Sequence, residues 1–134
     1  MSWQSLVFAI VLAMALVSLG GAQQSLPAQK ILSQIAAGQP VHYDGIAITG
    51  DLDLSTLPGA QIPAAFALFN CTIPDASFEG ITFAEDAFFW GSSFGNASFQ
   101  GATFLGRADF ANTSFRQASF AGCTFYQPAL FGGA

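Results

Sequence analysis

The chain aligns with itself in three consecutive rows of twenty-one residues between Pro63 and Phe125. The rows read PAAFALFNCTIPDASFEGITF, AEDAFFWGSSFGNASFQGATF and LGRADFANTSFRQASFAGCTF. An internal period of this length is typical of a repeat fold and constrains the architecture more than any other pattern. Four apolar columns recur, namely Leu68, Phe89 and Phe110; Ile73, Phe94 and Phe115; Phe78, Phe99 and Phe120; and Phe83, Phe104 and Phe125.

The spacing within each row predicts a chain that turns a corner every five residues. Ala97 and Phe99 are two residues apart, so in an extended segment both side chains point the same way. The next inward pair, Ala102 and Phe104, starts three residues after Phe99, which a straight strand with one inward face cannot accommodate. Four such corners close a square coil of about twenty residues, and successive coils stack like parallel strands about 4.8 Å apart.

One extra residue per row recurs at the same corner. The step between inward aromatic residues is six, not five, from Phe83 to Phe89 and from Phe104 to Phe110. We assign Phe89 to the inside because Ala87 precedes it by two, whereas Phe88 would place an unpaired Asp86 charge inside. The sequence therefore predicts a stacked column of bulges at this corner. Asp86 and Arg107, one coil apart there, are expected to form an exposed ion pair.

The five-residue units NASFQ, GATFL, RADFA, NTSFR, QASFA and GCTFY resemble the pentapeptide repeat family, with Phe at the central position. The segment GDLDLS at residues 50–55 resembles the opening repeats of that family, and the likeness covers about residues 46–131. The resemblance implies an all-β solenoid, a right-handed quadrilateral β-helix of about four coils over residues 42–134. It implies little about function, since family members do unrelated things.

The first twenty-two residues predict export. An apolar run from Leu6 to Leu19, interrupted by Ser18, is followed by small residues suited to cleavage. We expect a signal peptide over residues 1–22, although no Lys or Arg precedes the run. The alternative is an uncleaved N-terminal membrane anchor, in which only residues 6–22 contact the membrane. The expected location is therefore secreted or at the cell surface.

Residues 23–41 are expected to be a linker and a capping helix. Ile31, Leu32 and Ile35 share one helical face, and Gly38 followed by Pro40 suits a helix end. The pattern predicts one short helix over about residues 28–37 that covers the open first coil. The segment 42–62 then aligns as an imperfect first row, which places Ala47, Leu52, Leu57 and Ile62 in the four inward columns.

Both cysteines are expected to be buried free thiols that serve as small core residues. Cys71 and Cys123 occupy inward small sites of different columns, roughly 12 Å apart along the axis, whereas a disulfide needs Cα atoms within about 7 Å. Three Asn-X-Ser/Thr sequons begin at Asn70, Asn96 and Asn112. The repeat itself places Asn at a corner and Ser or Thr at the next outward site, so we interpret the sequons as a product of the fold, although export would permit glycosylation.

Composition argues against several function classes. The formal net charge is −5 with only three Lys and Arg residues, so a basic patch for nucleic acid is not expected. The single histidine, His42, lies at the edge of the degenerate first coil and has no expected catalytic partners. The sequence therefore predicts no catalytic residue, no cofactor site and no metal site; an enzyme with a pocket around His42 is the least favoured alternative.

Two surfaces are candidates for contacts with a protein partner. Phe69 and Trp90 are twenty-one residues apart and both follow an inward residue, so they are expected to project outward on one face, flanked by Phe88. An exposed apolar patch often marks a contact surface, although the N-terminal helix could instead cover it. The open last coil is the second candidate, as a homodimer end, unless Tyr126 and the tail fold over it. Its residues are Phe125, Tyr126, Leu130 and Phe131.

These observations favour a non-enzymatic exported scaffold or protein-binding module whose partner the sequence does not identify. The alternative is an acidic DNA-mimic inhibitor of a DNA-binding enzyme such as DNA gyrase, which resembles the activity of some family members. Acidity and shape fit this alternative, whereas the export signal and the short solenoid do not. The family resemblance also implies a homodimer through the C-terminal coil, because characterised members commonly associate there.

Overall fold

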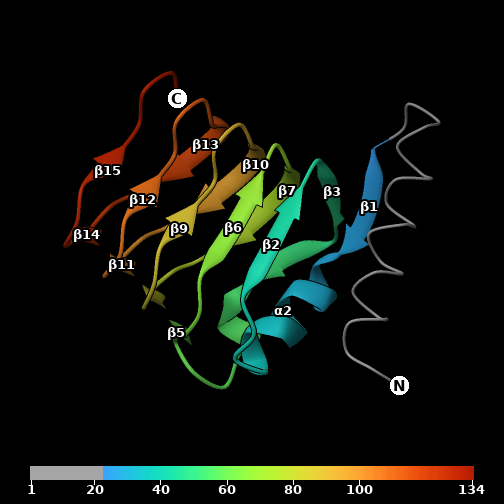
Figure 1. Cartoon of the computed structure of the whole chain (residues 1–134), viewed down its shortest axis with the longest axis horizontal. Helices are drawn as coiled ribbons and strands as arrows, with labels where there is room; N and C mark the ends of the chain where they lie inside the picture. The colour runs from blue at the N-terminus through green and yellow to red at the C-terminus, as the bar shows by residue number, and fades with distance from the viewer. Residues whose placement is uncertain (1–22) are drawn as a thin grey trace.

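The computed structural model describes residues 23–134, which form a β-helix of stacked square coils (Figure 1). All strand pairs are parallel, and the strands build three sheets that run along the solenoid. Sheet 1 contains β1 (Gln24–Pro27), β3 (Ile46–Thr49), β4 (Asp51–Asp53), β7 (Thr72–Ser77), β10 (Ser93–Ser98) and β13 (Ser114–Ser119). Sheet 2 contains β2 (Val41–Asp44), β6 (Phe66–Phe69), β9 (Ala87–Phe88), β12 (Ala108–Asp109) and β15 (Ala129–Leu130). Sheet 3 contains β5 (Gln61–Ile62), β8 (Thr82–Phe83), β11 (Thr103–Phe104) and β14 (Thr124–Phe125).

The predicted period of twenty-one residues and its inward phase are confirmed. Phe94 pairs with Ile73 and Thr103 pairs with Thr82 in the next coil. Phe89 is fully buried, whereas Phe88 is half-buried, so the extra residue falls in the corner before them as predicted. Sheet 1 forms two adjacent sides of the square. Its six-residue strands bend in the middle, at Pro74, Gly95 and Arg116, which lie above one another but form no strand pairs.

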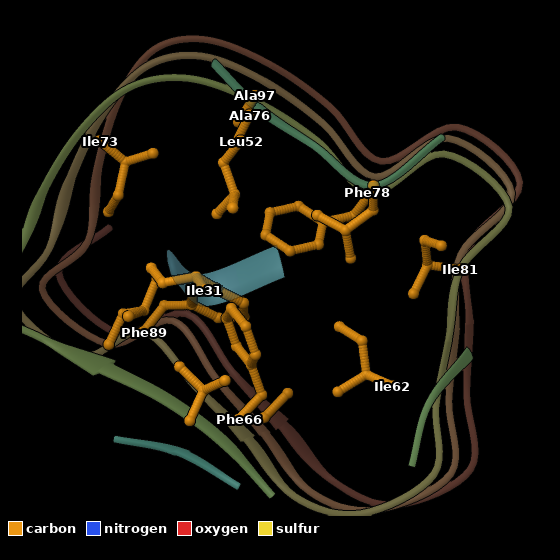
Figure 2. Close-up of a cluster of buried hydrophobic side chains, with 14 of the residues drawn as sticks. Ile31, Leu52, Ile62, Phe66, Ile73, Ala76, Phe78, Ile81, Phe89 and Ala97 are labelled. Atoms are coloured by element: carbon orange, nitrogen blue, oxygen red, sulfur yellow. The ribbon is translucent and has the colours of Figure 1, made fainter. Parts of the chain in front are cut away.

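The core contains columns of parallel phenylalanine rings. Figure 2 shows Phe66, Phe78 and Phe89 among the side chains that fill the inside of the coils. Phe78 and Phe99 lie 4.9 Å apart between ring centroids, as do Phe99 and Phe120, with interplanar angles of 6° and 3°. The spacing follows from the coil rise of about 4.8 Å, which places equivalent rings in face-to-face contact. Rings from neighbouring columns meet edge to face, as Phe99 and Phe110 do at 5.3 Å and 86°. The interior is therefore filled by aromatic contacts in two directions.

The first coil departs from the predicted register. Tyr43 pairs with Leu68 and Ala47 with Thr72, an offset of twenty-five residues, whereas Leu52 pairs with Ala76 at an offset of twenty-four. Of the four assigned column positions, only Ile62, paired with Phe83, is correct.

The departure has a local cause. Ile46 and Ile48 form one buried inward pair, and Leu52 and Leu54 form the next. Relative to the next coil, the first coil has one additional residue at the turn around Gly50, whose φ is +81°. It has three more near the 3₁₀ turn η1 (Leu54–Thr56). The longer first coil thus keeps its apolar residues inside at the cost of the regular period.

Helix α2 (Ala28–Ala36) lies where the sequence predicted a helix, one residue shorter at its end. Ile31, Leu32 and Ile35 are buried in the core cluster, and Figure 2 shows the helix across the middle of the square formed by the coils. The helix therefore caps the first coil as expected. Phe66, which the alignment did not identify, is fully buried in the position that Ala87 occupies one coil later.

Strand β1 was not predicted and extends sheet 1 by pairing with β3. The predictions for residues 1–22, a signal peptide or a membrane anchor, lie outside the described residues. Within residues 23–134, no helix has the length and apolar character needed to cross a bilayer.

Candidate functional site

The predicted partner surface lies on the outside of sheet 2, where two outward rows run along the solenoid. One row contains His42, Ala67, Phe88, Asp109 and Leu130, and the other contains Asp44, Phe69, Trp90, Ala111 and Gly132, as the strand register and the adjoining backbone hydrogen bonds show. We call Phe69, Phe88 and Trp90 the aromatic patch.

The rings of the patch are arranged diagonally across the coils. Phe69 stacks on Phe88 with 6.1 Å between centroids and an interplanar angle of 19°, and His42 meets Phe69 edge to face at 5.6 Å. Phe69 and Trp90 occupy consecutive positions of one row as predicted, but the ring that stacks on Phe69 is that of Phe88. Trp90 remains 42% exposed.

Arg107 extends the diagonal by one more coil. Its guanidinium carbon lies 5.7 Å from the centroid of the Phe88 ring, and its Nη2 lies 3.6 Å from Oδ2 of Asp86. The backbone N–H of Arg107 also donates to Oδ1 of Asp86 at 2.9 Å. The predicted Asp86–Arg107 ion pair is thus present, and because both side chains reach solvent it contributes at most about 1 kcal/mol.

The alternative that the N-terminal helix covers the aromatic patch is wrong. Helix α2 buries Ile31, Leu32 and Ile35 against the core at the end of the solenoid, not against the outside of sheet 2. Within the part of the chain that the structure describes, the patch is therefore open to a partner.

A groove that was not predicted from the sequence runs across sheet 1 and has a volume of about 430 Å³. Its base is formed by an inward column of one leucine and three alanines, and amide, carboxylate and hydroxyl groups line both sides. The amide of Asn96 donates to Asp75 at 2.9 Å, and the hydroxyl of Ser98 donates to Glu79 at 2.9 Å. The signal that could have located it is the repeated alanine column. The lining columns are Leu52, Ala76, Ala97 and Ala118; Asp51, Asp75, Asn96 and Gln117; and Asp53, Ser77, Ser98 and Ser119.

The predicted dimer end is the last coil, where β13, β14 and β15 are the outermost strands of the three sheets. Phe131 stacks on Phe110 at 5.0 Å and Phe125 stacks on Phe104 at 4.9 Å, each through one ring face only. Tyr126, Leu130 and Phe131 are 66%, 55% and 42% exposed, so Tyr126 does not fold over the end. The aromatic columns therefore stop without a covering layer among the described residues.

No metal-binding cluster is found among residues 23–134. No group of three or more His, Cys, Asp and Glu side chains lies close enough to hold a metal ion in that part of the chain. His42 contributes its ring to the aromatic surface through Phe69 and lies on the exposed side of β2.

One inward column contains polar side chains whose role was not predicted from the sequence. Cys71, Ser92 and Thr113 occupy it in successive coils, and all three are buried. The hydroxyl of Ser92 donates to the carbonyl of Leu68 at 2.5 Å, and that of Thr113 donates to Phe89 at 2.8 Å. Both buried hydroxyls are therefore satisfied by the backbone of the preceding coil.

Both thiols are free, as predicted, but the prediction that both are buried is wrong for Cys123. Cys71 is buried, whereas Cys123 lies half-buried in the open last coil, and burial raises the pKa of both thiols. We expect iodoacetamide to modify Cys123 slowly in the folded protein and Cys71 only after unfolding, as measured by mass spectrometry of modified peptides. Equal modification of both residues in the native protein would contradict this difference in burial.

The raised pKa of the thiols favours their neutral form in the folded protein. We therefore expect the free energy of unfolding to fall as the pH rises above the thiol pKa of the unfolded chain, about 8.5.

The sequon asparagines Asn70 and Asn112 have a structural role. Both adopt left-handed backbone conformations, with φ of 52° and 54°, at the corner where Gly91 and Gly133 stand in the intervening coils. The Asn70 side chain occupies the space that a Cβ atom at Gly91 would need. Asn96 donates to Asp75 in the preceding coil.

We expect Gly91→Ala to destabilise the protein by about 2 kcal/mol. The substitution forces a Cβ atom onto a residue with φ of +72° and displaces the Asn70 amide, which donates to Asp44 at 3.1 Å. Urea unfolding measures the loss. The control is Gly59→Ala, because Gly59 has open space at its Cβ position and no positive φ. A Gly91→Ala variant as stable as the control would disprove the proposed fit.

Comparison with known families agrees with the repeat pattern. Residues 89–134 match the family model of pentapeptide repeats (9 copies), a segment that begins at the buried Phe89 and includes the last complete coil. No curated protein and no solved structure matches the chain.

Proposed function

Because the chain is a pentapeptide repeat-containing protein, we propose that it is a non-enzymatic protein-binding module that uses the aromatic patch as its contact surface. Proteins built from these repeats are generally structural or binding proteins without enzymatic activity. The observation that supports the proposal is the 42% exposure of Trp90 beside Phe69 and Phe88 on an uncovered sheet face.

The patch has the composition of a protein contact surface. Tryptophan, tyrosine and arginine dominate the binding energy of protein interfaces. The patch contains Trp90, and the guanidinium of Arg107 lies over the ring of Phe88. Stacking with Phe88 restricts the Phe69 ring before any partner arrives. A rigid aromatic surface loses less conformational entropy on binding than a flexible one.

The experiment that tests the proposal compares two serine substitutions at equally exposed apolar residues. The tagged full chain is recovered from its own cells as wild type, Trp90→Ser and Leu105→Ser, since Leu105 is also 42% exposed but lies outside the patch. We expect a co-purified protein to be retained by wild type and Leu105→Ser and reduced at least tenfold by Trp90→Ser, as measured by quantitative mass spectrometry. Equal recovery with all three proteins would refute the patch as the contact surface.

We further propose that the protein acts outside the cytoplasm, as a secreted or cell-surface protein. The apolar run from Leu6 to Leu19 supports this location, and an uncleaved membrane anchor is the alternative. Cell fractionation together with sequencing of the mature N-terminus separates the two: cleavage near Ala22 supports export, and an intact N-terminus in the membrane fraction supports the anchor.

We also propose that two copies associate through the last coil. Support comes from the uncovered ring faces of Phe125 and Phe131 and from the unpaired outer edges of the three last strands, since unprotected edges invite pairing. The DNA-mimic inhibitor ranks second as a function. Its requirement for a continuous acidic surface fits poorly with carboxylates divided between sheet 1, which carries Asp51 and Asp75, and sheet 2, which carries Asp44 and Asp109.

A further inference from the structure

The protein holds one of its own arginines with a single aromatic ring and a single carboxylate. Arg107 lies 5.7 Å from the Phe88 ring centroid and 3.6 Å from the Asp86 carboxylate on the exposed side of sheet 2. A guanidinium in this position gains both cation–π attraction and an ion pair. The surface beside the patch is therefore suited to cationic side chains.

A second ring and a second carboxylate occur beside it. Phe89 N–H donates to Asp109 O at 2.8 Å and Gly91 N–H donates to Ala111 O at 3.1 Å, so Trp90 lies alongside Ala111 and diagonally from Asp109. Diagonal positions two residues along an adjacent strand are separated by about 8 Å, which leaves room for one side chain between them. Trp90 is also the stronger cation–π acceptor of the two ring types.

The Asp109 carboxylate is fixed in place beside this space. Its Oδ1 accepts the backbone N–H of Ala111 at 2.9 Å, and it forms no ion pair among residues 23–134. The row that contains Trp90 continues with Ala111 and Gly132, so no large side chain follows Trp90 in that row. Arg107, the one basic residue nearby, is already paired with Asp86.

The charge of this face favours a basic partner. Sheet 2 and its bulged corner carry four carboxylates and the single guanidinium of Arg107, within a chain of net charge −5. Lys30 lies on helix α2 and Arg116 lies on β13 of sheet 1, away from the patch. The carboxylates are Asp44, Glu85, Asp86 and Asp109.

We propose that the aromatic patch docks a basic segment of a partner protein, with an arginine of that segment inserted between the Trp90 ring and the Asp109 carboxylate. This inference rests on the proposed function as a protein-binding module and specifies the chemistry of the partner. The Arg107–Phe88–Asp86 contact is the intramolecular counterpart of the proposed contact.

The test uses the full chain with octa-arginine as the probe and octacitrulline, its neutral isostere, as the matched control. The chain has two tryptophans, so a Trp3→Phe background makes Trp90 the sole tryptophan reporter. We expect saturable binding of octa-arginine with a change in Trp90 emission, and no saturable binding of octacitrulline. Calorimetry then gives the dissociation constants of the variants.

Three substitutions separate the proposed contact from general attraction to an acidic protein. We expect Trp90→Leu and Asp109→Asn each to raise the dissociation constant about five- to tenfold, as loss of one cation–π or charged contact predicts. Asp75→Asn removes the same charge from sheet 1 and should change it less than twofold. An Asp75→Asn effect as large as that of Asp109→Asn, equal binding of octacitrulline, or unchanged Trp90 emission at saturation would each overturn the inference.

The outcome is distinguishable from failure of the proposed function itself. If Trp90→Ser loses the cellular partner but octa-arginine does not bind at the patch, the protein-binding module stands and its partner is not basic there. If Trp90→Ser retains every cellular partner, the proposed function fails whatever the peptide does.

Discussion

Phe99→Ala should be the most destabilising single truncation in the core, lowering the free energy of unfolding by about 3–5 kcal/mol. Phe99 is fully buried and stacks at 4.9 Å on Phe78 on one side and on Phe120 on the other. Its ring also meets Phe110 edge to face at 5.3 Å and Phe89 at 5.7 Å. The cavity left by an alanine cannot close, because the coil backbones are held at a fixed rise by hydrogen bonds on both sides.

Two control variants make the Phe99 prediction specific. Phe88→Ala removes the same kind of side chain from the outside of sheet 2, where it is half-buried. Apart from the loss of its stacking contact with Phe69, this substitution should lower the free energy of unfolding by less than about 1 kcal/mol. Phe120→Ala affects the same column in a half-buried position one coil nearer the open end, and should fall between the two. Thermal unfolding followed by circular dichroism measures all three. Equal midpoints for Phe99→Ala and Phe88→Ala would mean that the inward phase is wrong.

The inward phase of the regular coils was predictable because each position is stated several times. Ala97, Ala102 and Ala108 each precede an inward phenylalanine by two residues, so the repeats agree with one another on which face is buried. The choice of Phe89 over Phe88 needed only the cost of placing Asp86 inside. This part of the fold was predictable because several repeats show the same pattern, not because any single repeat is decisive.

The first coil was not predictable by extending the period backwards. The pairs Ile46 with Ile48 and Leu52 with Leu54 carry the required spacing of two, but their separation from each other is six residues, not five. An alignment at a constant twenty-one residues therefore misses Ile46, Ile48 and Leu54. It also places Leu52 in the wrong inward column and assigns Ala47 to the core. A search for inward pairs, independent of the period, would have found the correct register.

The candidate site was predictable as a set of positions but not as a set of contacts. Period and phase place Phe69, Phe88 and Trp90 on the outside of one sheet. They do not determine that Phe69 stacks on Phe88, because the side-chain rotamers depend on the small Ala67 that lies beside Phe88 in its row. The sheet 1 groove was missed because the alanine column at its base, Ala76, Ala97 and Ala118, was interpreted only as the inward small position of the repeat.

Phe131→Glu should convert a dimer into a monomer, raising the dimer dissociation constant about 100-fold or more. Phe131 presents a 42% exposed ring at the end of the solenoid, stacked on Phe110 through one face only. In an end-to-end dimer the other face is buried against the second copy, where an unpaired carboxylate costs several kcal/mol. A two-fold arrangement is expected, because the same end of each copy must face the other.

Light scattering on the full chain, on Phe131→Glu and on Leu105→Glu decides the question. Leu105 is also 42% exposed but lies on the side of the solenoid, so Leu105→Glu adds the same charge without touching the end. We expect wild type and Leu105→Glu to have the mass of a dimer and Phe131→Glu that of a monomer. A monomeric wild type would disprove the proposed dimer. Equal loss of the dimer in both variants would mean that the contact does not lie at the last coil. Loss in Phe131→Glu alone would show that the uncovered aromatic columns are completed by a second copy of the chain.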